Sequence, residues 1–163
     1  LLDRTLEIAA TDYDLTKKFD FRSIAAVRKY DPDVPTVFCS PTDLEQVVYN
    51  LLANAAQAMA GAASPDRPPR LILRLRREDD FAVMEIEDNG PGMEEHVRRR
   101  VFEPLFSTKG PGEGTGLGLS LVYFIVVNTY GGSISVESEK GAGARFIIKL
   151  PLNRVEPGGA RQA

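Results

Sequence analysis

The chain has 163 residues, 43% of them hydrophobic and 26% charged, which is typical of one globular domain rather than a disordered or fibrous protein. A formal net charge of −3 argues against a protein that coats nucleic acid, so no nucleic-acid partner is expected. Because Cys39 and His96 are the only cysteine and histidine, zinc sites built from several such ligands are excluded. A lone cysteine also favours a reducing compartment, and we expect the domain in the cytoplasm.

The two ends of the chain lead us to expect a piece of a longer protein. The chain begins Leu-Leu-Asp without a methionine, and residues 153–163 contain Pro157, Gly158 and Gly159 with no apolar pattern. We therefore expect one structured domain over residues 1–152 and a frayed tail over residues 153–163. No apolar run in this sequence approaches the ~18 residues that cross a bilayer. A membrane tether elsewhere in the parent protein stays an open alternative.

The first part of the chain predicts a helix, a strand and a second helix. Residues 1–10 have apolar side chains at helical spacing, and residues 19–30 mix β-forming residues with charges. Ser40 followed by Pro41 is a strong helix start, because serine caps the first turn and proline fits the first helical position. We expect this second helix to run to about Met59 and a loop to follow it.

The remaining part predicts an α+β fold, because strands and helices are mixed without a βαβ rhythm. A glycine- and proline-rich stretch covers residues 88–114, and such a long irregular segment in a compact domain is usually functional. We expect a two-layer α/β sandwich with a mixed, mostly antiparallel sheet and the helices on one face. We expect strands near residues 71–75 and 82–86, joined by a turn at 78–80, and a short helix at 94–101. A helix at 117–130 is apolar nearly all round and is expected to be buried. Hairpin strands are expected at 133–138 and 144–150.

The helix that ends near Met59 has a narrow stripe of amides. Asn50, Asn54 and Gln57 fall within one sector at about 100° per residue. A single such residue usually marks a solvated face, but two asparagines one turn apart also offer amide oxygens suited to a hydrated Mg²⁺. The apolar side is expected in the core and consists of Leu44, Val47, Val48, Leu51, Leu52, Ala55, Ala58 and Met59.

A second motif, Asp-Asn-Gly-Pro-Gly-Met over residues 88–93, follows the strand that ends near Glu87. Asn-Gly alone indicates a turn. The functional interpretation places the Asp88 carboxylate at a strand end, where it accepts a hydrogen bond from the amino group of a purine. Gly90 and Gly92 would then let the backbone approach the ring closely, just before Met93.

A third motif, Gly-Glu-Gly-Thr-Gly-Leu-Gly-Leu over residues 112–119, opens the apolar helix expected at 117–130. Successive glycines expose backbone N–H groups, and a helix N-terminus adds positive potential, so phosphate is the natural ligand. A flexible linker is the alternative. The motif is neither a Walker loop nor a dinucleotide fingerprint. Upstream, Lys109 is either a phosphate contact or an ordinary surface lysine.

In this order, the motifs resemble those of the ATP-binding domain of sensor histidine kinases, which belongs to a superfamily with gyrase, Hsp90 and MutL. "NLLANAAQAM" resembles the asparagine box, "DNGPGM" the first glycine box, "FEPLFSTK" the phenylalanine box and "GTGLGLS" the second glycine box. The resemblance covers about residues 1–152. Within the family, "NAAQAM" resembles the nitrogen-regulator type of sensor kinase.

The resemblance implies a Bergerat-type sandwich that binds ATP with Mg²⁺ under a mobile lid. By position, Asn54 would bind Mg²⁺ and Asn50 would be a partner on the Mg²⁺ or the phosphate side. Asp88 would accept the adenine amine, and Phe102 with Phe106 would anchor the lid. Lys109 and the glycines of the second glycine box would contact the phosphates. The implied ATP-binding set is Asn50, Asn54, Gln57, Asp88, Gly90, Gly92, Met93, Phe102, Phe106, Lys109, Gly114, Thr115, Gly116, Leu117 and Gly118.

Two departures from the family pattern bear on nucleotide contacts. Gln57 stands where many histidine kinases have a lysine, and Ala144 stands where a threonine is frequent. A third position bears on chemistry, because related ATPases have a glutamate in place of Asn50. An amide cannot act as a general base, and Glu45 projects away from the amide stripe, so we expect weak ATP hydrolysis.

The resemblance also implies partners outside this chain. The γ-phosphoryl group would go to a histidine on a dimerisation domain of the same protein, and indirectly to a response regulator, with this piece monomeric and its parent a homodimer. His96 lacks the acceptor motif. Residues 98–100 are three arginines, which form either a solvated face or a docking site for the acceptor helices or for phosphate. A gyrase- or Hsp90-class ATPase and a non-catalytic nucleotide-sensing domain are the alternatives.

Overall fold

A single five-stranded sheet organises the domain. The computed structural model describes residues 1–11, 21–108 and 115–153. The strands are β1 (Ala25–Tyr30), β2 (Arg70–Glu78), β3 (Phe81–Asp88), β4 (Ser133–Glu139) and β5 (Gly143–Pro151), in the spatial order β1-β2-β3-β5-β4. Only the β1–β2 pair is parallel, and the other three neighbouring pairs are antiparallel. The predicted mixed, mostly antiparallel sheet is therefore confirmed.

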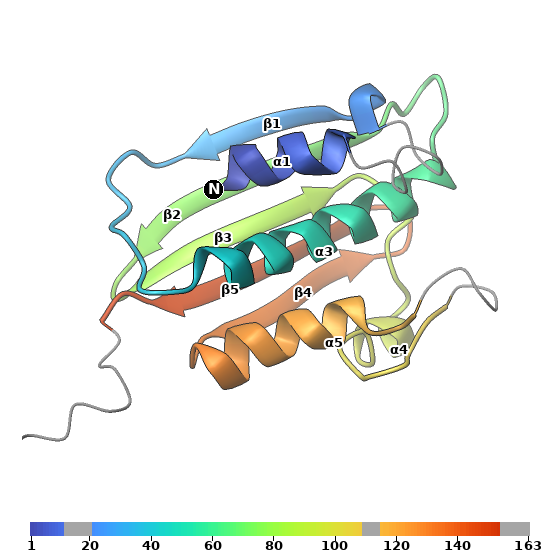
Figure 1. The fold of residues 1–163 in the computed structure, drawn as a ribbon. Coiled ribbons are helices and arrows are strands. Elements are labelled where there is room, and N and C mark those ends of the chain that lie inside the picture. Colours follow the sequence, from blue (N-terminus) through green and yellow to red (C-terminus); the bar gives the residue numbers. More distant parts are fainter. Residues whose placement is uncertain (12–20, 109–114, 154–163) are drawn as a thin grey trace, which may run out of the picture.

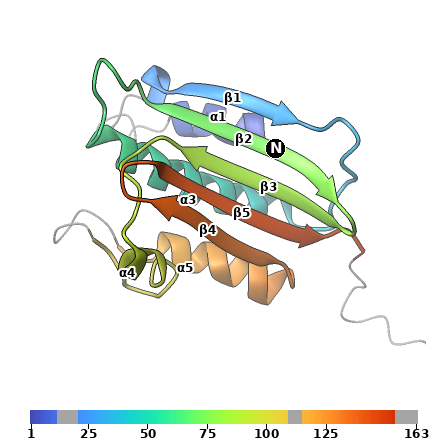
Figure 2. The ribbon, with the colours of Figure 1, turned by 180° about the vertical axis from the view of Figure 1, so that it is seen from behind.

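The helices gather on one face of this sheet. They are α1 (Leu2–Thr11), α3 (Pro41–Ala60), the short α4 (Glu95–Arg98) and α5 (Gly118–Tyr123), which continues as the π-helical segment η2 (Phe124–Thr129); a 3₁₀ turn, η1, covers Phe21–Ser23. Figure 1 shows α1, α3 and α5 in front of the strands, and Figure 2 shows the opposite face without a covering helix among the described elements. The two-layer sandwich with helices on one face is confirmed.

The core lies between α3 and the middle strands. Alternation along the strands turns Leu73, Ile86 and Phe146 toward the helices, and each is almost fully buried. Helix α3 begins as predicted, with the Ser40 hydroxyl accepting a hydrogen bond from the Asp43 N–H at 3.4 Å. Its buried side chains are Val47, Val48, Leu51, Leu52, Ala55, Ala56 and Met59.

The apolar side of α3 differs from the prediction in three positions. Ala56 is buried, whereas Leu44 and Ala58 are only partly buried. The reason is that α3 contacts both α1 and α5, so its buried surface is wider than a single apolar stripe and is turned relative to it. Ala58 is thereby placed on the side of the helix that carries the amides.

Two predicted elements have other boundaries. The strand expected over residues 19–30 begins at Ala25, because its partner β2 begins at Arg70 and the preceding Pro68 and Pro69 have no N–H for a ladder. The helix expected over residues 94–101 ends at Arg98 and continues in tight turns. Residues 12–20, 109–114 and 154–163, which include most of the predicted tail, lie outside the described residues.

The predicted burial of residues 117–130 is wrong for one side of that segment. Val122 and Val126 are buried against the sheet, but Leu121 and Phe124 are 41% and 56% exposed. Helix α5 packs with one side against α3, and its continuation η2 contacts β4 and α3. No described element covers the other side of this segment. One side of this apolar segment is therefore exposed to solvent. Sequence periodicity cannot show which side of an apolar helix is left uncovered.

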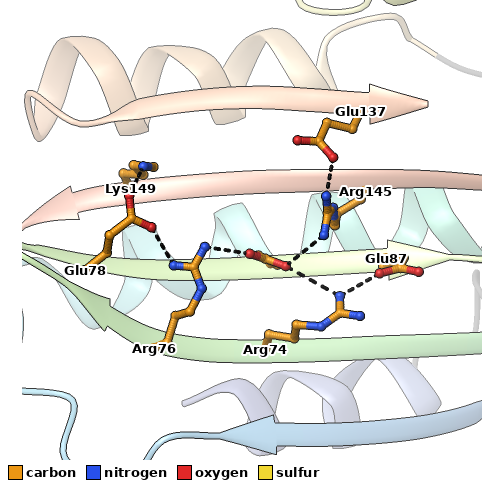
Figure 3. A network of polar contacts seen from close by, with 8 residues as sticks. Arg74, Arg76, Glu78, Glu87, Glu137, Arg145 and Lys149 are labelled. Atoms are coloured by element: carbon orange, nitrogen blue, oxygen red, sulfur yellow. Dashed lines mark hydrogen bonds and ion pairs between the residues drawn. The ribbon is translucent and has the colours of Figure 1, made fainter.

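The open face of the sheet has a network of charged side chains, shown in Figure 3. Its centre is Glu85, which is only 4% exposed and lies 3.0 Å from Arg76, 3.4 Å from Arg74 and 3.7 Å from Arg145. Arg145 also pairs with Glu137 on the edge strand β4. Strands β2, β3, β5 and β4 are thus connected by cross-strand ion pairs.

We expect Glu85→Gln to lower the free energy of unfolding by about 1–3 kcal/mol, because three arginines lose the buried charge they share. The matched variant Glu137→Gln removes a carboxylate that is 59% exposed, and its effect should stay within about 1 kcal/mol. Urea denaturation of both variants measures the difference. Equal losses would contradict a central role for Glu85.

Candidate functional site

A cavity of about 470 Å³ lies between α3, the loop after β3, and the segments on either side of residues 109–114. Cavities of this size are typical of sites for small molecules such as nucleotides. Its walls bring together residues from distant parts of the sequence: Asn50, Ala53, Asn54, Gln57, Ala58, Pro91, Gly92, Met93, Val97, Val101, Phe106, Ser107, Thr108, Thr115, Gly116, Gly118 and Leu119.

The predicted amide stripe of α3 forms one wall of this cavity. Asn50, Asn54 and Gln57 all line it, as helical periodicity requires for residues three to four positions apart. The Nδ2 atom of Asn50 is buried and has no hydrogen-bond partner among the described residues. A buried donor without a partner is unfavourable, so this atom fits an oxygen acceptor supplied by a ligand. The amide carbonyls of Asn50 and Asn54 are likewise suitable ligands for Mg²⁺.

Asp88 lies at the end of β3, 4% exposed, behind the cavity wall rather than on it. Its Oδ1 accepts a hydrogen bond from the Gly90 N–H at 2.8 Å. A Cβ on Gly90 would lie 2.8 Å from this Oδ1 and 3.4 Å from the Ala58 Cβ, so only glycine fits between the carboxylate and the wall. A smaller hollow of about 300 Å³ lies at the same end of β3, with Asp88, Arg67 and Arg70 among its lining residues.

Burial raises the pKa of Asp88 to about 6. Hydrogen bonds from the Gly90 and Ala144 backbone N–H groups and the charge of Arg67 lower this pKa, and the charge of Glu87 raises it further. Desolvation is the largest of these effects because the ionised carboxylate loses its water shell at this position. A carboxyl group with a perturbed pKa beside a cavity is a typical feature of functional sites.

The wall opposite α3 is built from both sides of residues 109–114. The Gly116 carbonyl accepts a hydrogen bond from the Leu105 N–H at 3.0 Å. Gly116 has a φ of +66°, and a Cβ there would lie 2.7 Å from the Leu105 carbonyl carbon. Phe106 lines the cavity and carries the Arg100 guanidinium 4.5 Å from its ring centroid. The glycine at 116 is therefore required both by its backbone conformation and by a close approach.

Some predicted site residues are placed elsewhere. Phe102 packs its ring against Phe146, at a centroid distance of 6.2 Å, and against Tyr123. It therefore anchors the segment that precedes residues 109–114 to the hydrophobic core. Leu117 is 47% exposed and, like Gly90, is not among the lining residues. Lys109 and Gly114 lie outside the described residues.

The sequence reasoning missed several lining residues. Ala53 and Ala58 lie one turn beyond Asn50 and Asn54, so the spacing of the stripe itself could have found them. Val97 and Val101 are four residues apart in the predicted short helix, which is a comparable signal. Pro91, Ser107, Thr108 and Leu119 belong to the quoted motifs but offered no separate reason to be chosen.

Charged residues near the cavity behave as a solvated surface. The side chains of Arg98 and Arg99 both pair with Glu95, and Arg100 pairs with Glu103. His96 is exposed, with its Nδ1 3.4 Å from a Glu94 oxygen. These local pairs agree with the solvated-face interpretation of residues 98–100. Within the residues that the structure describes, no cluster of three or more His, Cys, Asp or Glu side chains could hold a metal ion.

Comparisons with known proteins identify the family of this chain. Residues 39–154 match the family described as histidine kinase-, DNA gyrase B-, and HSP90-like ATPase. The chain is 44% identical over 110 residues to the two-component sensor PprA of Pseudomonas aeruginosa, covering 67% of this chain and 12% of that protein. It is 31% identical over 153 residues to the histidine-protein kinase AtoS of Escherichia coli, covering 94% of this chain and 23% of that protein.

Solved structures give the same result. The mycobacterial sensor histidine kinase MprB has a TM-score of 0.73 and 28% identity, with 94% of this chain and 93% of that chain covered. The catalytic domain of the histidine kinase ThkA, at 24% identity and a TM-score of 0.72 over 94% of this chain and 95% of that chain, shares the fold.

The chain belongs to the family of histidine kinase-, DNA gyrase B- and HSP90-like ATPases, as an ATP-binding catalytic domain of the sensor histidine kinase type. It spans about a tenth to a quarter of the length of the curated relatives it matches, 12% of PprA and 23% of AtoS. Among the described residues, no helix has the length and apolar character needed to cross a membrane.

Proposed function

We propose that this domain binds Mg-ATP in the 470 Å³ cavity and transfers the γ-phosphoryl group to a histidine on a dimerisation domain of its parent protein. The observation that carries the proposal is the amide wall of α3, where the buried Nδ2 of Asn50 has no partner among the described residues. Within this family, that donor suits a phosphate oxygen. The parent would be a homodimeric sensor of a two-component pathway, acting on a response regulator in the cytoplasm, where ATP is available.

The residues divide into a base end and a phosphate end. Asp88 would accept a hydrogen bond from the adenine amine, with Gly90 and Gly92 giving the ring close access to the backbone. Asn54, with Asn50 beside it, would hold Mg²⁺ through amide oxygens, and the ion when bound would neutralise phosphate charge. The remaining proposed contacts to the nucleotide are Gln57, Met93, Phe106, Lys109, Gly114, Thr115, Gly116 and Gly118.

The chemistry of the cavity favours phosphoryl transfer to a positioned acceptor over hydrolysis. Among the described lining residues none is a carboxylate, and Asn50 cannot act as a general base. Glu45 lies 3.7 Å from Arg4 on the α1 side of α3. Transfer by positioning and charge neutralisation needs no such base when an imidazole is the nucleophile. A gyrase- or HSP90-class ATPase therefore has less support.

The uncovered side of α5 supports the acceptor domain as the partner. Leu117, Leu121 and Phe124 are each 41–56% exposed, and Leu117 directly precedes Gly118, which lines the cavity. An apolar surface at the mouth of a phosphate-donor site fits helices that bring a histidine to it. The "NAAQAM" sequence, in addition, supports a parent of the nitrogen-regulator type.

The test is a titration of the domain with Mg-ATP, followed by incubation of γ-labelled ATP with the parent protein. We expect binding at or below millimolar nucleotide and a label on the acceptor domain that is labile to acid and stable to base, as phosphohistidine is. Absence of Mg-ATP binding at millimolar concentration would overturn the proposal. Steady multiple-turnover release of phosphate from the domain alone would favour the ATPase instead.

We expect Asn50→Ala to weaken Mg-ATP binding at least tenfold, which corresponds to about 1.4 kcal/mol, while the free energy of unfolding of the nucleotide-free domain changes by less than about 1 kcal/mol. The reason is that the free protein loses only an amide whose Nδ2 has no partner. Gln46→Ala is the matched control, because Gln46 lies one turn earlier, is exposed and does not line the cavity. Calorimetric titration and urea denaturation measure the two effects, and equal affinities for both variants would contradict the assignment.

A further inference from the structure

The turn between β4 and β5 is bound tightly to the loop that follows Asp88. The Gly141 N–H donates to the Pro91 carbonyl at 2.5 Å, and the Met93 N–H donates to the Ser138 hydroxyl at 2.9 Å. Ser138 donates in turn to the Gly143 carbonyl at 2.7 Å. The loop that borders the proposed adenine end of the cavity is therefore shaped by a hairpin about fifty residues away in the sequence.

A single side chain bridges these two segments from a third place in the chain. Arg67, in the loop between α3 and β2, donates from Nη1 to the Gly141 carbonyl at 2.8 Å and from Nη2 to the Gly90 carbonyl at 3.2 Å. Its own backbone is fixed by a hydrogen bond from the Arg67 N–H to the Ser64 carbonyl at 2.9 Å, and Pro68 and Pro69 follow it.

We propose that Arg67 is a positioning residue for nucleotide binding, because its guanidinium holds the Gly90 carbonyl and the Gly141 carbonyl in one arrangement and so fixes the loop that follows Asp88 and carries Gly92 at the adenine end of the cavity. The inference rests on the proposed function. Arg67 does not line the cavity, so it acts through Gly90 and not by touching ATP. Only a planar guanidinium can donate in two such directions from one rigid group; a lysine ammonium would keep the charge but lose the fork.

The charge of Arg67, like its hydrogen bonds, favours binding of the adenine amine at Asp88. The charges that act on Asp88 are those of Arg67 and of Glu87, its neighbour on β3, while the nearby Ala58 of α3 is uncharged. Arg67 lowers the pKa of Asp88, which burial raises. Loss of the guanidinium charge leaves a larger fraction of Asp88 protonated near neutral pH, and a protonated carboxyl accepts the adenine amine less well.

The experiment compares Arg67→Gln and Arg67→Lys with Arg77→Gln, which removes one positive charge at the far β2–β3 turn. Each protein is titrated with Mg-ATP and with the Mg complex of purine riboside triphosphate, which lacks the 6-amino group. We expect Arg67→Gln to weaken ATP binding about five- to tenfold and the analogue by less than twofold. We also expect the pH midpoint of ATP binding to rise in Arg67→Gln but to stay unchanged in Arg67→Lys.

The possible outcomes distinguish a failure of the role proposed for Arg67 from a failure of the proposed function on which it rests. If the unchanged domain fails to bind Mg-ATP, the proposed function falls, and the role of Arg67 with it. If the unchanged domain binds and Arg67→Gln behaves like Arg77→Gln, only the inference is overturned. An equal loss of affinity for both nucleotides would show a general structural role, and would overturn the positioning of the purine as well.

Discussion

Replacement of Asp88 by asparagine is expected to weaken Mg-ATP binding by about 1–3 kcal/mol, through loss of a charge-assisted hydrogen bond to the adenine amine. Oδ1 of Asp88 accepts from the Gly90 N–H at 2.8 Å, so an asparagine would keep its carbonyl there and turn its amide nitrogen elsewhere. That nitrogen is a donor and cannot accept from the amine. Calorimetric titration with Mg-ATP measures the loss, and retained affinity would show that the purine binds elsewhere.

The same substitution is expected to stabilise the nucleotide-free domain above pH 6. Burial raises the pKa of Asp88 from its ordinary 3.8 to about 6, so the folded state holds this proton more tightly than the unfolded state. Stability therefore falls as pH rises from about 4 to 6, by about 3 kcal/mol at 1.36 kcal/mol for each pH unit. Below pH 4 both states are protonated and the penalty is absent.

Urea denaturation at pH 4.5 and pH 8 measures this effect. We expect Asp88→Asn to gain stability relative to the unchanged domain as pH rises between these values, whereas the control Asp80→Asn, at an exposed turn, should follow the unchanged domain. Parallel pH dependence of all three proteins would contradict a raised pKa at Asp88. A carboxylate whose burial lowers stability in this way fits the proposed role of Asp88 in binding rather than in folding.

Gly143→Ala is expected to lower the free energy of unfolding by about 2–4 kcal/mol. We expect this to be the largest loss caused by adding a single methyl group to a residue at the β4–β5 turn. Gly143 has a φ of +88°, which is unfavourable for alanine by about 1–2 kcal/mol. A Cβ at this position would also overlap the Asp88 backbone carbonyl, so β3 and β5 would have to move apart at the end of the sheet. Mg-ATP affinity should fall together with stability, because Asp88 is part of the contact.

Gly141→Ala is the matched control within the same turn. Its φ of +86° imposes the same backbone strain, but a Cβ there meets nothing within 4 Å. The difference between the two variants in urea denaturation therefore isolates the collision with Asp88 from the cost of the left-handed conformation. We expect Gly141→Ala to lose about 1–2 kcal/mol and to keep most of its ATP affinity. Equal losses for both would mean that strain alone matters.

Local sequence determined much of this protein. The amide stripe of Asn50, Asn54 and Gln57 follows from helical spacing, and the start of α3 follows from the Ser40 cap, because both depend on residues within a few positions of one another. The strands were predicted from the alternation of apolar side chains, which is likewise a local pattern. The order of the motifs was sufficient to indicate the family and the sandwich fold.

Tertiary structure alone decided what surrounds those residues. The raised pKa of Asp88 depends on burial and on Ala144, and the Arg67 bridge joins carbonyls that are 23 and 74 residues away. The sequence of residues 117–130 predicts burial all round, yet Phe124, the first residue of η2, is exposed because no described element packs on that side. Periodicity reports only that a side chain is apolar or polar. Which distant segment meets it is set by packing across the whole chain, and that information is not local.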